Sequence, residues 1–332
     1  MVIPTFNRVA SLQRTLESLC AIQSETPFEV VVVNDGSTDT TASMLDDIDL
    51  GYPLTVLHQD NMGPSAARNR GVEAATGELI VFTDDDCVAD PRLLQAHRAA
   101  HDSNDTFRRV VLGSMRAEDL SKLSPWTAWE QRRIERTFDV LSHGEALPTW
   151  RNLFTGNASI RRSELMRVGG FNTEHRRGED IELGLRLDRE GFEFVFSPDA
   201  NVIHHPHRSL DAWEHIAKSY GEMAVILRSE EGRPVRDVRD ADEFSERKRV
   251  VQVLALLTAH HPRRTRVIVG MLRAVVRLSV RVGLDQVTQP ALSLLFNTVF
   301  FCALAAAIAN SDREVASQKG EDGEMITGHF GS

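Results

Sequence analysis

Short apolar runs that alternate with helix-like segments dominate the first hundred residues of the chain. Four consecutive valines occupy 30–33, and similar runs stand at 54–57 and 79–82. Runs of this kind are typical of strands that are buried on both faces of a sheet. Between them lie helical patterns, such as the leucines spaced by four and three residues within 12–19. This alternation predicts an α/β fold with a parallel sheet and right-handed crossovers.

Polar clusters directly follow two of these predicted strands. The string Asn-Asp-Gly-Ser-Thr-Asp at 34–39 comes after the valine run, and Asp84, Asp85 and Asp86 come after the run at 79–82. The carboxyl ends of parallel strands meet at one edge of a sheet, where ligands bind. We therefore expect both clusters at the binding edge.

The three consecutive carboxylates of 84–86 repel one another, so folding them at a strand end costs free energy unless a cation offsets their charge. In an extended segment, Asp84 and Asp86 point to the same side. That spacing suits a hard divalent ion such as Mg²⁺ or Mn²⁺, bound mainly by oxygen and completed by a phosphorylated ligand. The alternative is a solvated acidic turn before Pro91.

Four further positions suit either a structural or a chemical role. The turn that holds Asp35 either caps the next helix or brings this carboxylate to a nucleotide base. Arg68 lies in a helix opened by small residues, which let a ligand approach the backbone, although an ordinary surface helix needs none of this. Asp180 is either a helix cap or a general base in a cleft. The pattern also predicts a helix at 126–141 and strands at 192–196 and 201–203. His204 follows the second of these strands and is either a metal ligand or an ordinary histidine.

Composition excludes several classes of protein. The chain has 38 basic and 48 acidic residues, a net charge of −10, which argues against a general nucleic-acid binder. Its three cysteines have no CxxC spacing, which excludes a disulfide framework and a thiolate zinc site and indicates a reducing compartment. Only three residues precede Pro4, so we expect no secretory signal and either a stub as first strand or a clipped start.

The last third of the chain is basic and apolar. Residues 245–281 carry nine Lys or Arg and one acid, and the stretches 250–257 and 267–282 are apolar. Helices of this kind lie on an anionic membrane surface, or cover the preceding domain with snorkelling arginines. Residues 291–309 carry no charge and are near the length of a bilayer span, with a buried helical hairpin as the alternative.

Taken in order, these segments resemble family 2 glycosyltransferases with the GT-A fold, over roughly residues 1–210. The strings that carry the resemblance are IPTFNR at 3–8, NDGSTD at 34–39, NMGPSAARNRG at 61–71, FTDDD at 82–86, GNASIRR at 156–162, GGFN at 169–172, GEDIELGLRL at 178–187 and the strand-end His204. The resemblance implies inverting transfer of a sugar from a UDP-, GDP- or dTDP-linked donor to an acceptor hydroxyl, with Mn²⁺ or Mg²⁺ as cofactor.

The resemblance also implies roles for single residues. Asp180 would be the catalytic base, with Glu179 beside it. The metal would be held by Asp86, Asp84 and His204, with His205 as an alternative to His204. The residues implied to bind the nucleotide sugar are Pro4, Thr5, Asn7, Arg8, Asp35, Gly63, Arg68, Asp84, Asp85 and Asn157.

The expected architecture is an α/β GT-A domain, in which a Rossmann-like nucleotide-binding sheet merges with a mixed α+β acceptor region, followed by a C-terminal helical region. The expected boundaries are 1–115 for the nucleotide-sugar half, 116–210 for the acceptor and catalytic half, 211–310 for the helices and 311–332 for a mobile acidic tail. We expect a cytoplasmic enzyme, peripheral or anchored at the inner face of the cell membrane. It would act in cell-surface polysaccharide or glycolipid synthesis, on a saccharide or lipid-linked acceptor. The alternatives are an inactive sugar-nucleotide-binding protein and a nucleotidyltransferase.

Overall fold

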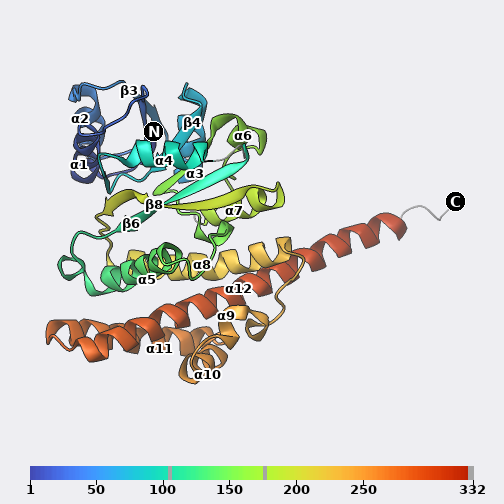
Figure 1. Ribbon diagram of the computed structural model, residues 1–332. Coiled ribbons are helices and arrows are strands. Elements are labelled where there is room, and N and C mark those ends of the chain that lie inside the picture. Colours follow the sequence, from blue (N-terminus) through green and yellow to red (C-terminus); the bar gives the residue numbers. More distant parts are fainter. Residues whose placement is uncertain (104–106, 175–177, 328–332) are drawn as a thin grey trace. The chain divides into compact units, whose positions relative to one another are not determined.

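The computed structural model of the protein describes residues 1–103, 107–174 and 178–327, without the side chains of 312 and 314–327. The chain forms two compact units, Met1–His207 and Arg208–Ser332 (Figure 1). Each unit is described by itself below.

The first unit is built on one sheet of eight strands in the order β3-β2-β1-β4-β7-β6-β8-β5. The strands are β1 (Val2–Thr5), β2 (Val30–Asp35), β3 (Leu54–Gln59), β4 (Leu79–Thr83), β5 (Cys87–Ala89), β6 (Arg109–Arg116), β7 (Asn157–Arg161) and β8 (Glu193–His204). Its helices are α1 (Val9–Leu19), α2 (Thr41–Asp47), α3 (Pro64–Ala74), α4 (Leu93–Asp102), α5 (Pro125–Ser142), α6 (Arg162–Arg167) and α7 (Glu179–Arg189), with short 3₁₀ turns at Leu120–Lys122 and Trp150–Asn152.

The sheet is mixed. Strands β3, β2, β1 and β4 run parallel, as the alternating pattern predicts, whereas β7 pairs antiparallel with β4 and β6. From β1 the chain passes to β2 and β3 on one side and then returns to β4 on the other side of β1. The carboxyl ends of β1 and β4 therefore frame a topological switch point, which is where open α/β sheets bind ligands.

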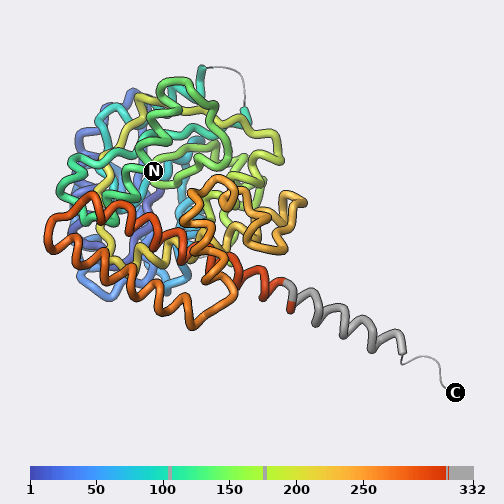
Figure 2. The backbone as a smooth tube through the Cα atoms, turned by 90° about the horizontal axis from the view of Figure 1, so that it is seen from below, coloured from blue at the N-terminus to red at the C-terminus, as the bar shows by residue number. Residues whose placement is uncertain are grey.

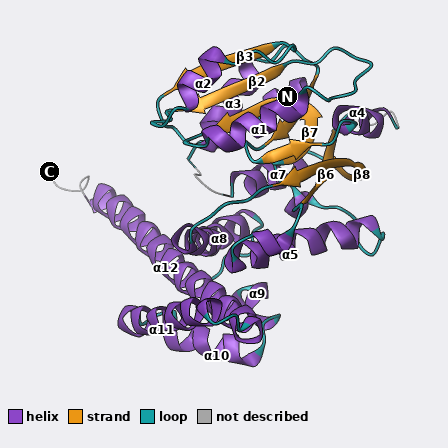
Figure 3. Ribbon diagram, turned by 90° about the vertical axis from the view of Figure 1, so that its left-hand side faces the viewer, coloured by secondary structure: helices purple, strands orange, loops and turns teal. Residues whose placement is uncertain are grey.

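The valine run is buried because helices cover both faces of the sheet (Figure 3). Ile3, Val30 and Val32 belong to one core cluster with the leucines of α1. Val2 and Val33 point the other way, toward α3, where a Cβ on Gly71 would lie only 2.5 Å from a methyl group of Val2. This alternation along each strand explains why the run is apolar without interruption.

The sequence pattern predicts two strands at 192–196 and 201–203, but the structure has the single strand β8. Its register against β6 shifts between the pairs Leu112–Phe196 and Ser114–Asn201, so that residues 197–200 lie opposite Gly113 alone. The backbones approach closely there, because a Cβ at Gly113 would lie 2.4 Å from the carbonyl oxygen of Ala200. The predicted break is thus an irregularity within one strand.

The second unit is helical, as the sequence predicts, and Figure 2 follows its chain through α10 and α11 into α12. Its elements are α8 (Leu210–Glu230), a 3₁₀ turn (Val238–Asp240), α9 (Asp242–Ser245), α10 (Arg249–Thr258), α11 (Pro262–Arg281) and α12 (Asp285–Thr327). Phe301 and Leu304 of α12 pack in one core cluster with Val238 and Val251.

Helix α12 runs through the charge-free segment 291–309 without a reversal. Its part Asp285–Ser311 is long and apolar enough to cross a membrane by length and composition, but 67% of its most apolar window is buried within the protein. Core helices of water-soluble proteins also combine these properties, so the segment is weak evidence for a membrane span. Residues 328–332 and most side chains beyond Ser311 lie outside the described part, so the mobile acidic tail at 311–332 stays a prediction.

Candidate active site

The site lies at the switch point, where Thr5 ends β1 and the acidic turn 84–86 follows β4. The hydroxyl of Thr5 donates a hydrogen bond to Oδ2 of Asp85 over 2.7 Å. Burial raises the pKa of Asp85 to about 7, although Arg8 and the hydrogen bond from Thr5 lower it. The structure therefore brings together two residues that the sequence assigns to the donor site.

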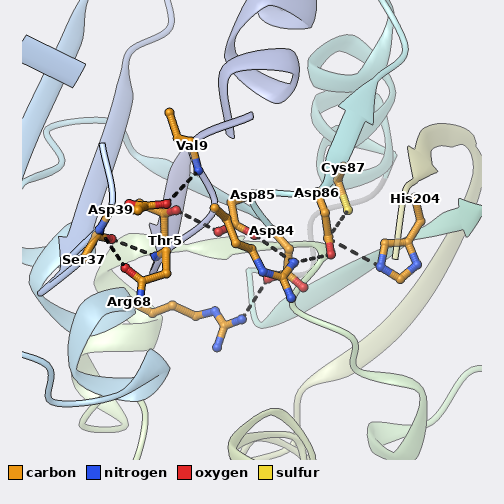
Figure 4. A network of polar contacts seen from close by, with 12 residues as sticks. Thr5, Val9, Ser37, Asp39, Arg68, Asp84, Asp85, Asp86, Cys87 and His204 are labelled. Atoms are coloured by element: carbon orange, nitrogen blue, oxygen red, sulfur yellow. Dashed lines mark hydrogen bonds and ion pairs between the residues drawn. The ribbon is translucent and has the colours of Figure 1, made fainter. Parts of the chain in front are cut away.

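The acidic turn differs from the expected extended segment. The amide of Cys87 donates to the carbonyl of Asp84 over 3.2 Å, which bends residues 84–86 between β4 and β5. Asp84 consequently faces Arg68, whereas Asp86 faces His204 (Figure 4). The prediction that Asp84 and Asp86 share one side is wrong, because the period of two holds only for an extended backbone.

Arg8 neutralises part of this negative charge. Its Nη1 lies 2.5 Å from Oδ2 of Asp86 and 3.3 Å from Oδ1 of Asp85. Burial acts to lower the pKa of Arg8, but the two carboxylates outweigh it and hold that pKa above its ordinary value. The repulsion within the acidic turn is thus offset by a protein cation as well as by any ion that binds there.

Asp86, Cys87 and His204 form a buried cluster whose potential ligand atoms lie within 4.8 Å of one another. The antiparallel pairing of β5 with β8 sets Cys87 directly opposite His204, and Nε2 of His204 lies 3.4 Å from Oδ1 of Asp86. His205 instead donates its backbone amide to the carbonyl of Asp86 over 2.8 Å.

The donor set of this cluster fits a divalent cation. Carboxylate oxygen and neutral imidazole nitrogen are both ligands of such ions. Burial, together with the charge of Asp86, raises the pKa of the Cys87 thiol well above its ordinary value, so this group is not a thiolate at neutral pH. Asp86 and His204 are therefore the residues of this cluster that would hold Mn²⁺ or Mg²⁺.

Gln131 orients His204, and no sequence motif pointed to it. Oε1 of Gln131 lies 2.8 Å from Nδ1 of His204. The amide nitrogen of the same glutamine donates to the carbonyl of Met115 over 3.0 Å and to Glu135 over 3.1 Å, so the oxygen must face the ring. His204 then donates through Nδ1, and its Nε2 is the ring nitrogen on the side of Asp86. The available signal was a glutamine on the buried face of the predicted helix 126–141.

Arg68 joins the acidic turn to the start of α7. Its Nη2 lies 2.9 Å from Oδ1 of Asp84, and its Nη1 lies 2.8 Å from Oε1 of Glu179. The side chain is buried and lies over the ring of Phe171. The resemblance implies that Arg68 binds the nucleotide sugar, and the structure pairs its side chain with two carboxylates.

Asp180 follows Glu179 in the first turn of α7 and is half-buried. Burial and the charge of Glu179 raise the pKa of Asp180 to about 7, although Arg68 and the amide of Ile181 lower it. A carboxyl group that titrates near neutrality is suited to accept a proton from a substrate.

Other predicted donor-site residues hold the loops at the carboxyl ends of β1 and β2. Asp35 accepts hydrogen bonds from the amides of Met62 (2.9 Å) and Gly63 (2.8 Å), which fixes the loop that enters α3. Gly63 adopts a φ of 91°, a conformation that favours glycine. Asn7, whose φ is 54°, accepts from the amide of Thr38 over 2.7 Å and ties the two loops together. Pro4 lies within β1.

Asn157 is buried and fully engaged within the protein. Its amide nitrogen donates to the carbonyls of Ser114 and Ala200, both over 2.9 Å, and its oxygen lies 2.9 Å from Nε2 of His97. These bonds join β7 to β6, β8 and α4. Asn157 therefore has a structural role in the sheet, and its implied part in binding the nucleotide sugar stays a prediction.

Comparison with known proteins finds glycosyltransferases among the relatives of this chain. The chain is 33% identical over 235 residues to validoxylamine A glucosyltransferase of Streptomyces hygroscopicus subsp. limoneus, an alignment that covers 62% of this chain and 51% of the relative. It is 25% identical over 221 residues to glucosyl-dolichyl phosphate glucuronosyltransferase of Haloferax volcanii, covering 61% of this chain and 68% of that protein. The chain thus spans between about half and two thirds of the length of these curated relatives.

Two solved structures share the fold. The mannosyltransferase PcManGT of Pyrobaculum calidifontis, in complex with GDP-Man and Mn²⁺, superposes with a TM-score of 0.56 at 19% identity, covering 93% of this chain and 86% of that chain. Residues 1–349 of TarS from S. aureus, in complex with UDP, superpose with a TM-score of 0.53 at 18% identity, covering 94% of this chain and 90% of that chain. These likenesses confirm the predicted α/β class with a C-terminal helical region.

The model of the family described as glycosyl transferase family 2 matches residues 1–169. This match covers the strands β1 to β4, the acidic turn and β7. The chain belongs to glycosyl transferase family 2.

Proposed function

We propose that this protein transfers a sugar from a nucleoside diphosphate donor to an acceptor hydroxyl, with inversion at the anomeric carbon. The observation that carries the proposal is the bridge of Arg68 between Asp84 and Glu179, which joins the acidic turn to the helix that bears Asp180. One site thereby combines a group able to accept a proton with carboxylates suited to a cation and a diphosphate. Family membership supports the same chemistry.

We propose that the donor binds at the carboxyl ends of β1, β2 and β4. Thr5, Asp35 and Gly63 line this edge, and Arg8 and Asp85 stand beside it. Asp86 and His204 would hold a divalent cation, with Asp84 on the donor side of the turn. A cation bound there supplies positive charge next to the diphosphate as that group departs. The two structural neighbours are complexes with GDP-Man and Mn²⁺ and with UDP, which supports a nucleotide-sugar donor.

Asp180 is the proposed general base. It takes the proton of the acceptor hydroxyl while the acceptor oxygen forms a bond to the anomeric carbon and the bond from that carbon to the diphosphate breaks. Attack from the side opposite to the leaving group inverts the configuration in a single displacement. A pKa of about 7 leaves a substantial fraction of Asp180 ionised near neutral pH.

We further propose that the acceptor is a saccharide or a lipid-linked molecule and that the reaction takes place at the inner face of the cell membrane, in the synthesis of a surface polysaccharide or glycolipid. The name of the Haloferax volcanii relative, which specifies a dolichyl phosphate glycolipid, supports a lipid-linked acceptor. The basic and apolar character of residues 245–281 supports the location.

The experiment that tests the proposed activity measures nucleoside diphosphate release from UDP-, GDP- and dTDP-sugars with Mn²⁺ or Mg²⁺ present. We expect release with one donor class, loss of that release in Asp180→Asn and no pyrophosphate. Pyrophosphate release from nucleoside triphosphates would indicate a nucleotidyltransferase instead. If the protein binds a donor but shows no turnover with any acceptor tested, membrane extracts included, the result would indicate a sugar-nucleotide-binding protein.

A further inference from the structure

Helix α11 of the second unit presents an apolar stripe to solvent. The α11 stripe, as it is called here, consists of Val267 (60% exposed), Met271 (56%), Val275 (41%) and Leu278 (63%), together with Val282 (58%), which caps the C-terminal end of the helix. They recur at intervals of three or four residues, so they share one side of the helix. Val276 and Ser279, on another side of the helix, are buried within the unit. The helix is therefore apolar on its outer side as well as toward its own core.

Arginines border this stripe. With 3.6 residues per turn, the exposed Arg263, Arg266, Arg277 and Arg281 fall along one margin of it. Arg273 behaves differently, because it pairs with Glu214 over 2.6 Å and with Asp211. Among the described residues, Arg277 and Arg281 have no carboxylate within ion-pair distance, and α11 itself contains no acidic residue.

We propose that the α11 stripe is a docking surface for a bilayer that contains anionic phospholipids. The apolar side chains enter the boundary between headgroups and acyl chains, and the bordering arginines bind lipid phosphates. The exposed Leu284 and Val287 extend the apolar surface past the end of α11. This inference rests on the membrane location proposed above and specifies the helix, the side chains and the lipid charge.

The contrast with α12 supports the assignment to α11. Most of the apolar window of α12 is buried in the core of the second unit, so its composition is explained by packing. The α11 stripe has no such cover within that unit. A second copy of the chain is a poorer occupant, since pairing two such stripes would bring bordering arginines together with no acid on either helix to offset them.

Vesicle flotation with the full chain tests the proposal. The protein is mixed with vesicles of phosphatidylcholine alone and with vesicles that also contain phosphatidylglycerol. We expect binding to the second kind only, weakened by salt. The double variant Arg277→Gln/Arg281→Gln should lower partitioning more than tenfold, because each arginine near an anionic surface contributes about fivefold. Its control is Arg132→Gln/Arg136→Gln, which removes two exposed arginines with the same spacing from α5.

The apolar side chains are tested in the same way. Met271→Gln/Leu278→Gln should abolish binding, whereas Leu147→Gln/Met166→Gln, at exposed apolar positions of the first unit, should leave it unchanged. All eight positions are exposed, and circular dichroism verifies that each variant folds. The proposal is overturned if the wild type ignores anionic vesicles, or if the α11 variants bind as well as their controls.

Two further results separate this proposal from its alternatives. If the wild type forms a dimer that Met271→Gln/Leu278→Gln dissociates, and if it does not bind vesicles, the partner of the α11 stripe is a second copy of the chain and not a bilayer. Donor binding, measured by thermal shift on the same preparations, reports on the proposed activity independently. Its loss with vesicle binding intact would contradict the proposed function alone, and the reverse result would contradict the docking surface alone.

Discussion

Arg68 and Glu179 form a buried ion pair of 2.8 Å although they stand 111 positions apart in the sequence. Arg68 belongs to α3, which follows the donor-side loop of Gly63, and Glu179 begins α7, which carries Asp180. The second bond of the same guanidinium, to Asp84, adds the acidic turn. A single side chain therefore sets the distance between the proposed donor-binding carboxylates and the proposed base.

Arg68→Gln is expected to reduce both stability and activity. Removing the cation leaves Glu179 buried without a partner, and loss of one member of a buried pair costs about 3–5 kcal/mol. The pKa of Asp180 should rise further, because Arg68 lowers it in the wild type. Urea unfolding and the pH profile of turnover measure the two effects. Arg70→Gln, which removes a bond to the carbonyl of His58 from the same helix, is the control and should change both far less.

Asp180→Asn is expected to lower turnover by about 10²–10⁴-fold with donor affinity unchanged, since a general base contributes about that much. Turnover of the wild type should fall as the pH drops through about 7, where Asp180 becomes protonated. Asp188→Asn, at an exposed position of α7, should retain wild-type turnover. Wild-type rates in Asp180→Asn would rule out this base.

Stability separates a catalytic loss from a folding defect in Asp180→Asn. The folded state raises the pKa of Asp180 from 3.8 to about 7, so ionising this carboxyl lowers wild-type stability as the pH rises through that window. An uncharged asparagine escapes this cost. The variant should therefore be at least as stable as the wild type above neutral pH in denaturant titrations.

The sheet and the positions of its ligand edge were predictable, because they follow from local patterns. The valine run predicts that β2 is buried. The polar strings at 34–39 and 84–86 predict which side chains lie at the carboxyl edge of the sheet. The resemblance in seven ordered strings added the family, which the family model confirms. The continuity of β8 was not predictable, since the close approach of Gly113 to Ala200 exists only in the folded sheet.

The pairing of side chains within the site was also beyond sequence reasoning. Arg68 pairs with two carboxylates and Arg8 with two others. These pairings depend on which segments come together in the folded chain, and the pattern of a single segment does not contain this information. The wrong expectation for Asp84 and Asp86 has the same origin, because the turn at 84–86 is closed by Cys87 and held by Arg8. Gln131 was not predicted as a site residue because it belongs to no motif.

Gln131→Leu is expected to weaken Mn²⁺ binding by about 10–100-fold, the usual effect of removing the partner of a ligating histidine. Leucine keeps the volume but accepts no hydrogen bond from Nδ1, so the ring of His204 loses its fixed tautomer and orientation. Electron paramagnetic resonance of free Mn²⁺ during titration measures the affinity without turnover. Arg132→Gln, at the next and exposed position of α5, is the control. Equal affinities for Gln131→Leu and wild type would show that Gln131 does not support a metal ligand.

His97→Gln is expected to protect the fold against acid. Burial lowers the pKa of His97 to about 4 from 6.5, so only the unfolded chain binds this proton between those values. Stability contributed by the neutral ring is therefore lost as the pH falls from 6.5 toward 4. Glutamine does not titrate, so the variant should lose less stability across this window in urea titrations. The exposed His207→Gln should follow the wild-type curve, and a His97→Gln curve as steep as that of the wild type would contradict the account.

The most direct test of the central claim is calorimetric titration of UDP, GDP and dTDP into the protein, with Mn²⁺ and with a chelator. We predict that at least one of these nucleotides binds, that binding requires the cation, and that Asp86→Asn abolishes it while Asp188→Asn leaves it intact. Binding that is equally tight in the chelator, or unchanged in Asp86→Asn, would contradict a cation-assisted nucleotide site at the acidic turn.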